Sequence, residues 1–142
     1  MTVTFCGHND IYYDSDIEQK LTTIVEELIV NGATEFLSGG YGAFDILSAK
    51  IIKNLQKKYP HIKSILVIPY LDRKYDTSMY DETIYPPLEN TPPKFAISKR
   101  NQWMVQNSET LVAYVRYSWG GAAKTLLFAK QKKKHMINIC TP

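Results

Sequence analysis

Hydrophobic and polar positions follow two different spacings along the chain. Short apolar runs, rich in β-branched and aromatic residues, predict strands over residues 2–6, 34–37, 63–69, 110–115 and 135–140. Between them, apolar residues recur every three or four positions, which predicts helices over residues 17–31, 44–55, 97–107 and 121–134. The first helix is expected to start at Asp14 or Ser15 as N-cap and to end at Asn31 and Gly32.

This alternation of strands and helices predicts a Rossmann-like three-layer α/β/α fold. Right-handed crossovers return each strand in the same direction, so the sheet is expected to be mostly parallel, with about five strands. A chain of 142 residues can bury its own core, and a single domain is expected over residues 1–142. In such sheets, ligands bind outside the carboxyl ends of the strands.

One long segment, residues 70–96, interrupts the alternation. It holds four of the seven prolines, and it has tyrosines at positions 70, 75, 80 and 85. A connection of this length is unusual in a compact domain. Because it starts where the third strand ends, we expect either a lid whose tyrosines stack on a base or a surface loop held by its own aromatic residues.

Two glycine-rich joints connect a strand to the following helix. They consist of Ser38, Gly39, Gly40 and Gly42 in "SGGYG", and of Gly120 and Gly121 in "SWGGAAKT". A helix N-terminus presents unpaired N–H groups, and glycine lets an anion approach the backbone closely. Glycine also serves tight turns for geometry alone. Two such joints at the ligand-binding edge nevertheless favour a ligand that carries phosphate.

Further candidate residues lie near these joints. Gly7 and His8 follow the first strand and are expected to form an adjacent wall, although a lone histidine also fits a hydrogen-bonded turn. Arg100 can hold phosphate or a sugar hydroxyl, or it is a surface arginine. Asp45 can bind a hydroxyl or amine of the ligand, or it simply stabilises the first helical turn. Trp119 can stack on a base, as can Trp103, or either can belong to the core or a subunit contact.

Composition narrows the class of protein. Apolar residues make up 44% and charged residues 22%, which is typical of a globular protein and excludes a disordered chain. No apolar run reaches the length of a membrane span, and the N-terminus lacks the pattern of a signal peptide, so a cytoplasmic protein is expected. Cys6 and Cys140 are expected to be buried thiols. No cluster with metal-ligand spacing surrounds His8, and no metal or cofactor is expected.

The net charge of +3 comes largely from two lysine clusters, at residues 57–58 and 132–134. Both lie where helices are expected to end, where cations interact favourably with the helix dipole. This edge of the sheet is opposite the glycine joints. The clusters therefore favour solvated helix ends over a nucleic-acid surface, and single-stranded DNA binding is kept as a second alternative function.

Three segments, "FLSGGYGAFD", "KRNQWMVQNSETLVAYV" and "WGGAAKTLLFAKQKKKHMINI", resemble the SLOG superfamily in sequence and order. This superfamily groups the single-stranded-DNA-binding DprA/Smf proteins, the LOG-type phosphoribohydrolases and YpsA-like proteins. The chain looks closest to small YpsA-like or DUF1273-like members, and the resemblance covers nearly its whole length. It implies a Rossmann-like fold that binds nucleotides or nucleotide-derived ligands through the glycine loops, and it permits a homodimer.

The chain matches the catalytic motifs of the LOG hydrolases only in part. LOG hydrolases carry an arginine that Arg100 matches, which makes it the best catalytic candidate, and a PGGxGTxxE motif in which Gly120, Gly121 and Thr125 are recognisable. Here no proline precedes the glycines, and no carboxylate follows the threonine. A carboxylate stabilises the transition state of N-glycosidic cleavage. Its absence weighs against a nucleoside 5′-monophosphate phosphoribohydrolase, which is kept as the first alternative. Asp45 resembles the aspartate of the DprA pattern SGGxxGID.

The expected function is therefore the binding of a nucleotide or nucleotide-derived small molecule, without membrane attachment. The predicted ligand-binding residues are Gly7, His8, Ser38, Gly39, Gly40, Gly42, Asp45, Arg100, Gly120, Gly121 and Thr125.

Overall fold

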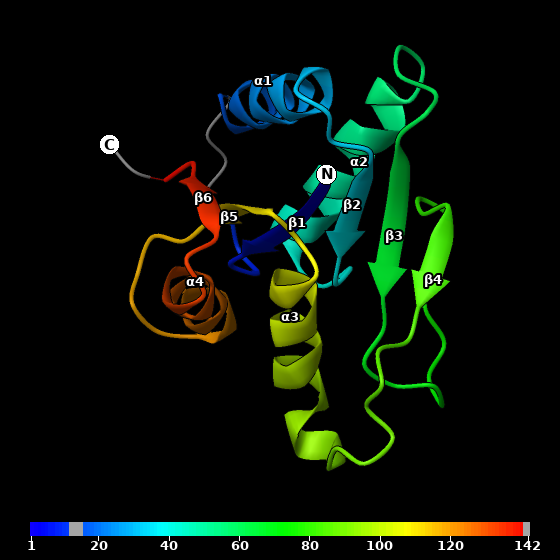
Figure 1. The fold of residues 1–142 in the computed structure, drawn as a ribbon, viewed down its shortest axis with the longest axis vertical. Helices are drawn as coiled ribbons and strands as arrows, with labels where there is room; N and C mark the ends of the chain where they lie inside the picture. The colour runs from blue at the N-terminus through cyan, green and yellow to red at the C-terminus, as the bar shows by residue number, and fades with distance from the viewer. Residues whose placement is uncertain (12–15, 141–142) are drawn as a thin grey trace.

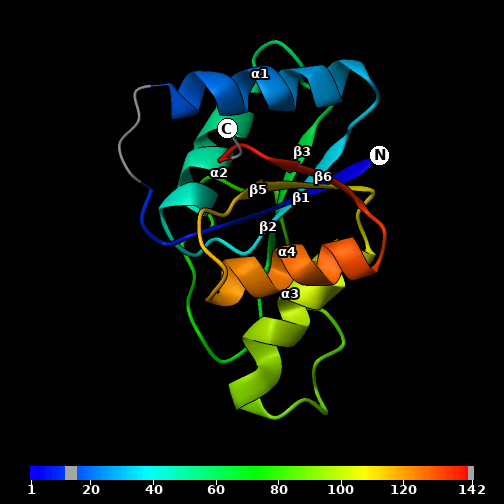
Figure 2. The same cartoon turned by 90° about the vertical axis from the view of Figure 1, so that its left-hand side faces the viewer.

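A computed structural model describes residues 1–11 and 16–140 and has an α/β fold with one parallel sheet. The strands are β1 (Thr2–Gly7), β2 (Glu35–Ser38), β3 (Lys63–Val67), β4 (Glu82–Ile84), β5 (Thr110–Tyr114) and β6 (His135–Asn138). The helices are α1 (Ile17–Val30), α2 (Ala43–Leu55), α3 (Ala96–Gln106) and α4 (Gly121–Gln131), and the short 3-10 helix η1 (Pro93–Phe95) precedes α3. Helices α1 and α2 cover one face of the sheet, and α3 and α4 cover the other (Figures 1 and 2). The predicted Rossmann-like three-layer fold is confirmed.

The strand order β4-β3-β2-β1-β5-β6 places a topological switch between β1 and β5. From β1 the chain moves outward to β2 and β3 on one side, whereas β5 leads to β6 on the other. The loops after β1 and β5 therefore lead to helices on opposite faces. Such a point leaves a crevice at the carboxyl ends of the strands, which is the usual ligand site of this architecture.

The ends of the elements differ from the prediction by a few residues. The expected N-cap residues Asp14 and Ser15 lie outside the described part of the chain, and α1 begins at Ile17. Helix α4 ends at Gln131, because Lys133 turns into the left-handed region with φ of 56°. The second lysine cluster therefore follows the helix instead of ending it.

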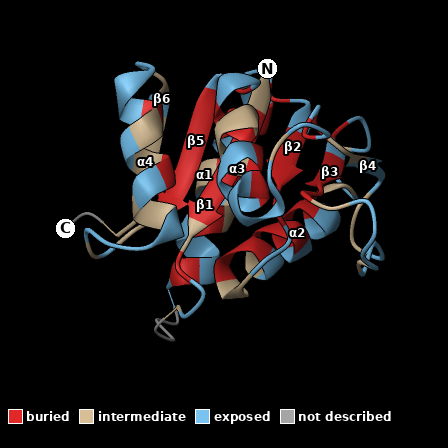
Figure 3. Cartoon of the chain, turned by 90° about the horizontal axis from the view of Figure 1, so that it is seen from below, coloured by how far each residue is buried: buried red, intermediate tan, exposed pale blue. Residues whose placement is uncertain are grey.

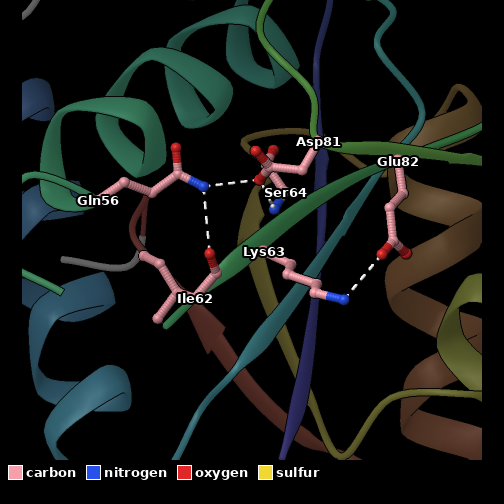
Figure 4. Close-up of polar contacts among 6 residues, drawn as sticks. All are labelled: Gln56, Ile62, Lys63, Ser64, Asp81 and Glu82. Carbon is pink, nitrogen blue, oxygen red and sulfur yellow. Dashed lines mark hydrogen bonds and ion pairs between the residues drawn. The ribbon is translucent and has the colours of Figure 1, made fainter. Parts of the chain in front are cut away.

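Strand β4 lies inside the segment that the sequence suggested to be irregular. Polar contacts hold its N-terminal end at the sheet edge (Figure 4), and Ile84 is the one residue of this strand that packs against a hydrophobic cluster. The Asp81 carboxylate accepts hydrogen bonds from the backbone N–H of Ser64 at 2.8 Å and from the Gln56 amide at 2.6 Å. Lys63 and Glu82 form an ion pair at 2.8 Å. A short polar strand of this kind leaves no apolar pattern in the sequence.

Most of the core lies between the sheet and helices α1 and α2. Phe5, Phe36 and Phe44 are fully buried there, and the Phe5 ring lies 6.2 Å from that of Phe36 and 6.3 Å from that of Phe44. A smaller cluster, including Leu111 and Ala129, lies under α4. Buried residues concentrate in β1, β2, β3 and β5, while the edge strands are more exposed (Figure 3). Burial thus increases toward the strands that carry the switch point.

Three further features concern the thiols, the helices and the metal-ligating side chains of the described residues. Both cysteines are free thiols; the prediction that they are buried holds for Cys6 but is wrong for Cys140, which is half-buried near the end of the chain. Among the helices described, none is long and apolar enough to cross a membrane. Within residues 1–11 and 16–140, no three His, Cys, Asp or Glu side chains gather in a way that could hold a metal ion.

Candidate functional site

A cavity of about 310 Å³ opens at the switch point, between the end of β1 and the start of α4. Its volume lies at the small end of the range of roughly 300–1,000 Å³ found for small-molecule sites. Loops after β1, β2 and β5 and the first turns of α3 contribute its walls. The predicted site residues that line it are Gly7, His8, Asp45, Arg100, Gly120, Gly121 and Thr125.

The other four predicted residues, Ser38, Gly39, Gly40 and Gly42, form the turn behind this wall. The Arg100 guanidinium covers Gly39, where an added Cβ would lie 2.9 Å from Cζ of Arg100. At Gly40 the backbone has φ of 66°, and a Cβ would lie 2.6 Å from a methyl of Leu66. The structure thus requires glycine here for close packing and turn geometry, and a ligand contact at these positions stays a prediction.

The two glycine joints have almost the same backbone conformation. Gly42, the N-cap of α2, has φ 90° and ψ 171°, and Gly120, the N-cap of α4, has φ 91° and ψ 174°. Only glycine adopts this region readily. The two joints differ in the residues that pack against the helix N-terminus. Asn9 packs against Gly42 and accepts a hydrogen bond from the N–H of Ala43 at 3.0 Å.

The N-terminus of α4, by contrast, faces open space. A Cβ added at Gly120 or at Gly121 would meet no atom within 4 Å. The first N–H groups of a helix have no partner within it, and they point along the positive end of the dipole. The Thr125 hydroxyl donates to the carbonyl of Gly121 at 2.9 Å and so belongs to the helix itself. Of the two joints, the one at α4 is the one that an anion can approach.

Asp45, in the first turn of α2, is the buried carboxylate of the cavity. Its side chain lies against the wall with 8% of the residue exposed. Oδ2 accepts a hydrogen bond from the backbone N–H of Tyr41 at 3.1 Å, while Oδ1 is buried without a partner among the described residues. Burial raises the pKa of this carboxyl from 3.8 to about 7, although the Tyr41 N–H and the charge of Arg100 both act to lower it. The group can gain or lose a proton near neutral pH.

Arg100 of α3 is buried rather than a surface residue. One nitrogen, Nη1, donates to the carbonyls of Gly39 at 3.2 Å and Val67 at 2.8 Å, and Nε donates to the Asn101 side chain at 2.8 Å. Burial lowers the pKa of the guanidinium, and Asp45 raises it. The arginine thereby ties α3 to the ends of β2 and β3. Its charge stands beside Asp45, but much of its hydrogen-bonding capacity is already used by the protein.

His8 begins a row of stacked rings that we call the aromatic ladder, formed by His8, Tyr117 and Trp119. The His8 and Tyr117 rings lie 3.6 Å apart at 5°, and the Tyr117 and Trp119 rings lie 4.2 Å apart at 23°. Nε2 of His8 accepts the backbone N–H of Arg116 at 2.8 Å, so the ring proton of the neutral form is on Nδ1. Burial, followed by the charge of Arg116, lowers the pKa of His8. The ladder runs from a neutral buried histidine to an indole that is 68% exposed.

The cavity also has lining residues that sequence reasoning did not place in the site, among them Tyr41, Asn101 and Tyr117. Tyr117 stands two positions before Trp119 in "YSWGG", and this aromatic pair beside a glycine joint was a usable signal. Asn101 follows Arg100 and was not distinguishable from a surface residue. Trp103 does not line the cavity; it packs beside Met104 in a small cluster under the sheet.

No family model matches the chain. Two curated relatives are similar to it. It is 29% identical over 138 residues to the uncharacterised SPbeta prophage-derived protein YoqJ of Bacillus subtilis (strain 168), covering 81% of this chain and 81% of that protein. It is 24% identical over 136 residues to a UPF0398 protein of Bacillus cereus (strain G9842), covering 86% of this chain and 71% of that protein.

Solved structures share the fold. DNA processing protein A (DprA) of Helicobacter pylori has a TM-score of 0.66 at 21% identity, over 96% of this chain and 63% of its own. DprA of Streptococcus pneumoniae has a TM-score of 0.68 at 19% identity, over 95% of this chain and 48% of its own. The protein TM1055 has a TM-score of 0.65 at 14% identity, over 95% of this chain and 71% of its own. These similarities show a shared α/β fold, while membership of the SLOG superfamily and of its YpsA-like or DUF1273-like subgroup stays a prediction.

Proposed function

We propose that the cavity binds a nucleotide or a nucleotide-derived small molecule. The observation that carries this proposal is the meeting, in one cavity, of an open helix N-terminus, the carboxyl of Asp45 in its wall and a ladder of aromatic rings. A helix N-terminus suits phosphate. A carboxylate accepts hydrogen bonds from hydroxyl or amino groups. An exposed indole at the rim provides a face on which a base can stack.

The fold similarity supports the same class of ligand. The structure of H. pylori DprA is described as one of a single-stranded-DNA-binding protein, so this architecture accommodates nucleotide units. The chain spans 63% and 48% of the two DprA chains, so their activity as whole proteins comes to this chain only as a proposal.

A charge placed at the open joint tests the proposal. Gly121 has space for a side chain and no strained φ, and an acidic residue in the first turn stabilises a helix. We expect Gly121→Asp to fold normally but to repel phosphate, while the nearly isosteric Gly121→Asn keeps binding. A thermal-shift screen would compare both with the wild type against nucleosides and nucleoside mono-, di- and triphosphates.

The expected signal is large enough to measure. A ligand at one hundred times its Kd stabilises a protein by about 2.7 kcal/mol, which corresponds to a shift of about 5–11 °C for a domain of roughly this size. Loss of the shift in Gly121→Asp alone would support the open joint as the phosphate site. Equal shifts in all three proteins would place the phosphate elsewhere, and no shift with any compound would refute the proposal.

A nucleoside 5′-monophosphate phosphoribohydrolase is the second candidate function. The observation that favours it is Asp45, because a cavity carboxyl with a pKa of about 7 suits proton transfer at neutral pH. It lies on α2, however, and not on α4, where the LOG motif has its glutamate. Release of free base from a nucleoside monophosphate, lost in Asp45→Asn and Arg100→Ala, would establish this activity. Intact nucleotide after long incubation would exclude it.

Single-stranded DNA binding is the third candidate, and the exposed aromatic residues Tyr41 and Trp119 at the cavity rim favour it. The lysine clusters weigh against it, because they follow the ends of α2 and α4, at the sheet edge away from the cavity. DNA binding predicts an affinity that falls steeply with salt. A homodimer and a cytoplasmic location stay predictions, and light scattering of the purified protein would test the first.

A further inference from the structure

We propose that His8 is the positioning residue of one cavity wall, and that it acts only while its ring is neutral. Protonation of the ring releases the rim segment, residues 116–119, and with it the aromatic ladder in front of the α4 N-terminus. The inference goes beyond the proposed function, because it concerns the shape of the cavity and holds whatever the cavity binds. It follows from the hydrogen bond that the ring accepts, from the few contacts that hold the rim segment, and from the fixed position of His8.

The hydrogen bond between His8 and Arg116 is possible in only one protonation state of the ring. Its donor is the backbone N–H of Arg116, which lies 2.8 Å from Nε2 of His8. Nε2 must therefore carry a lone pair, which it has in the neutral ring and loses in the imidazolium, where both nitrogens are donors. After protonation, two N–H groups face each other at hydrogen-bonding distance, so the peptide of Arg116 has to move away from the ring.

Few hydrogen bonds hold the backbone of the rim segment. Immediately before it, Val115 is fixed on both sides, because the Asn138 side chain accepts from its N–H at 3.1 Å and donates to its carbonyl at 3.0 Å. Within the described part of the chain, no hydrogen bond involves the backbone of residues 117–119. The contacts with His8 are therefore important for the position of this segment.

Ring stacking connects the protonation state of His8 to the rest of the rim segment. The Tyr117 ring lies on that of His8 at 3.6 Å, and the Trp119 ring stacks on Tyr117 at 4.2 Å. The segment leads directly into Gly120, the N-cap of α4. These four residues line the cavity. Displacement of the Arg116 peptide therefore shifts one wall of the cavity, including the exposed indole at its rim.

His8 itself is held by the sheet when the rim segment moves. Its backbone N–H donates to the carbonyl of Tyr114 at 3.2 Å, which continues the pairing of β1 with β5. The residue is only 4% exposed, so the ring has little access to solvent in its present position. Because His8 is fixed and the rim segment is weakly attached, protonation is expected to displace the segment and leave His8 in place.

The groups around His8 determine the pH at which the change occurs. Burial lowers the pKa of His8 from 6.5, the charge of Arg116 lowers it further, and Asp10 in the following loop acts in the opposite direction. The other titratable residues that line the cavity or lie against His8 are Cys6, Tyr41, Asp45, Arg100, Tyr114 and Tyr117. Asp45 has a pKa of about 7, so it is largely protonated before His8 becomes charged. The rim segment is therefore expected to change below pH 6.5.

An NMR titration of the full chain from about pH 8 to about pH 4.5 tests the inference. It follows the His8 imidazole, the Arg116 amide and the indole N–H groups of Trp119 and Trp103. We expect the first three to change together, with one midpoint below pH 6.5, while Trp103, which packs beside Met104, stays unchanged. Titration of His8 without a change at Arg116 and Trp119 would overturn the inference. A His8 ring that stays neutral until the whole protein unfolds would overturn it too.

Two substitutions separate the hydrogen-bond acceptor from the aromatic ring. His8→Gln keeps an oxygen that can accept the Arg116 N–H and that does not titrate. The signals of Arg116 and Trp119 should then lose their pH dependence and stay near their values in the neutral wild type. His8→Phe keeps a ring for Tyr117 but has no acceptor, so the Trp119 signal should be displaced at every pH. A Trp119 signal in His8→Phe that matches the neutral wild type would mean that the hydrogen bond does not position the rim segment.

Two further variants are controls for other titrating groups. Asp45→Asn removes the acid of the cavity wall, and His61→Gln makes the same change as His8→Gln at an exposed histidine that does not line the cavity. Both should keep the transition at Trp119. Persistence of the transition in His8→Gln, or its loss in Asp45→Asn, would assign it to another group and would overturn the inference.

Discussion

Replacing Asp45 by asparagine is expected to make the protein more stable than the wild type above pH 7. The carboxyl is buried beside a cavity, and its pKa in the folded protein is about 7 instead of 3.8. Between these two values the folded state holds a proton that the unfolded state has released. The stabilisation is therefore complete below about pH 4 and is lost as pH rises to about 7.

The size of this effect on the free energy of unfolding follows from the interval between the two pKa values of Asp45. A difference of one pH unit corresponds to about 1.4 kcal/mol, so the interval from 3.8 to about 7 amounts to about 4 kcal/mol. Asparagine is neutral at every pH and avoids this loss. Relative to the wild type, Asp45→Asn should gain about 4 kcal/mol in the free energy of unfolding between pH 4 and 8. Most of this gain should appear between pH 4.5 and 7.

Urea unfolding at pH 4.5, 5.5, 6.5 and 8.0 measures the effect. The control is Asp72→Asn, which makes the same chemical change at an exposed carboxylate that does not line the cavity. Parallel profiles for the wild type and Asp45→Asn would refute the reasoning, because they would mean that folding does not change the proton affinity of this group. A destabilised Asp45→Asn at pH 8 would mean that its ionised form is well solvated or paired.

Three other substitutions test separate features. Gly120→Ala should lower the free energy of unfolding by about 1–3 kcal/mol, because alanine is strained at φ 91°, whereas Gly121→Ala should change it little; urea titration compares them. Asp81→Ala removes the acceptor that holds the backbone of Ser64 and should cost about 1–3 kcal/mol, with faster amide hydrogen exchange confined to β3 and β4 as the distinguishing result. Trp119→Ala should leave stability within about 0.5 kcal/mol but weaken ligand binding by about 1–3 kcal/mol; unchanged affinity by titration would exclude base stacking on this ring.

The overall fold was predictable because the apolar pattern reports directly which strands are buried. β4 was not, because Glu82 and Asp81 attach it through polar contacts that depend on residues distant in sequence. The two glycine joints were recognisable as a pair of similar turns. Which of them is open depends on Asn9, which is brought against Gly42 only by the folded structure.

The roles of single polar residues were the least predictable part of the site. Arg100 had two interpretations at the level of sequence, and its burial against the carbonyls of Gly39 and Val67 follows from the crossing of α3 over β2 and β3. Likewise, Asp45 is an ordinary first-turn acid in the sequence. Its free oxygen and raised pKa arise from the neighbouring elements that enclose it.

The short strand β4 also determines how the sheet meets other molecules. An edge strand presents unpaired N–H and C=O groups, which can template pairing with a second chain. Here that edge is only the three residues Glu82–Ile84, and it carries an exposed glutamate. A short charged edge offers little length for another strand to add. The polar residues that give β4 no apolar pattern in the sequence also have a role at this edge. They protect the open side of the sheet from strand addition and aggregation.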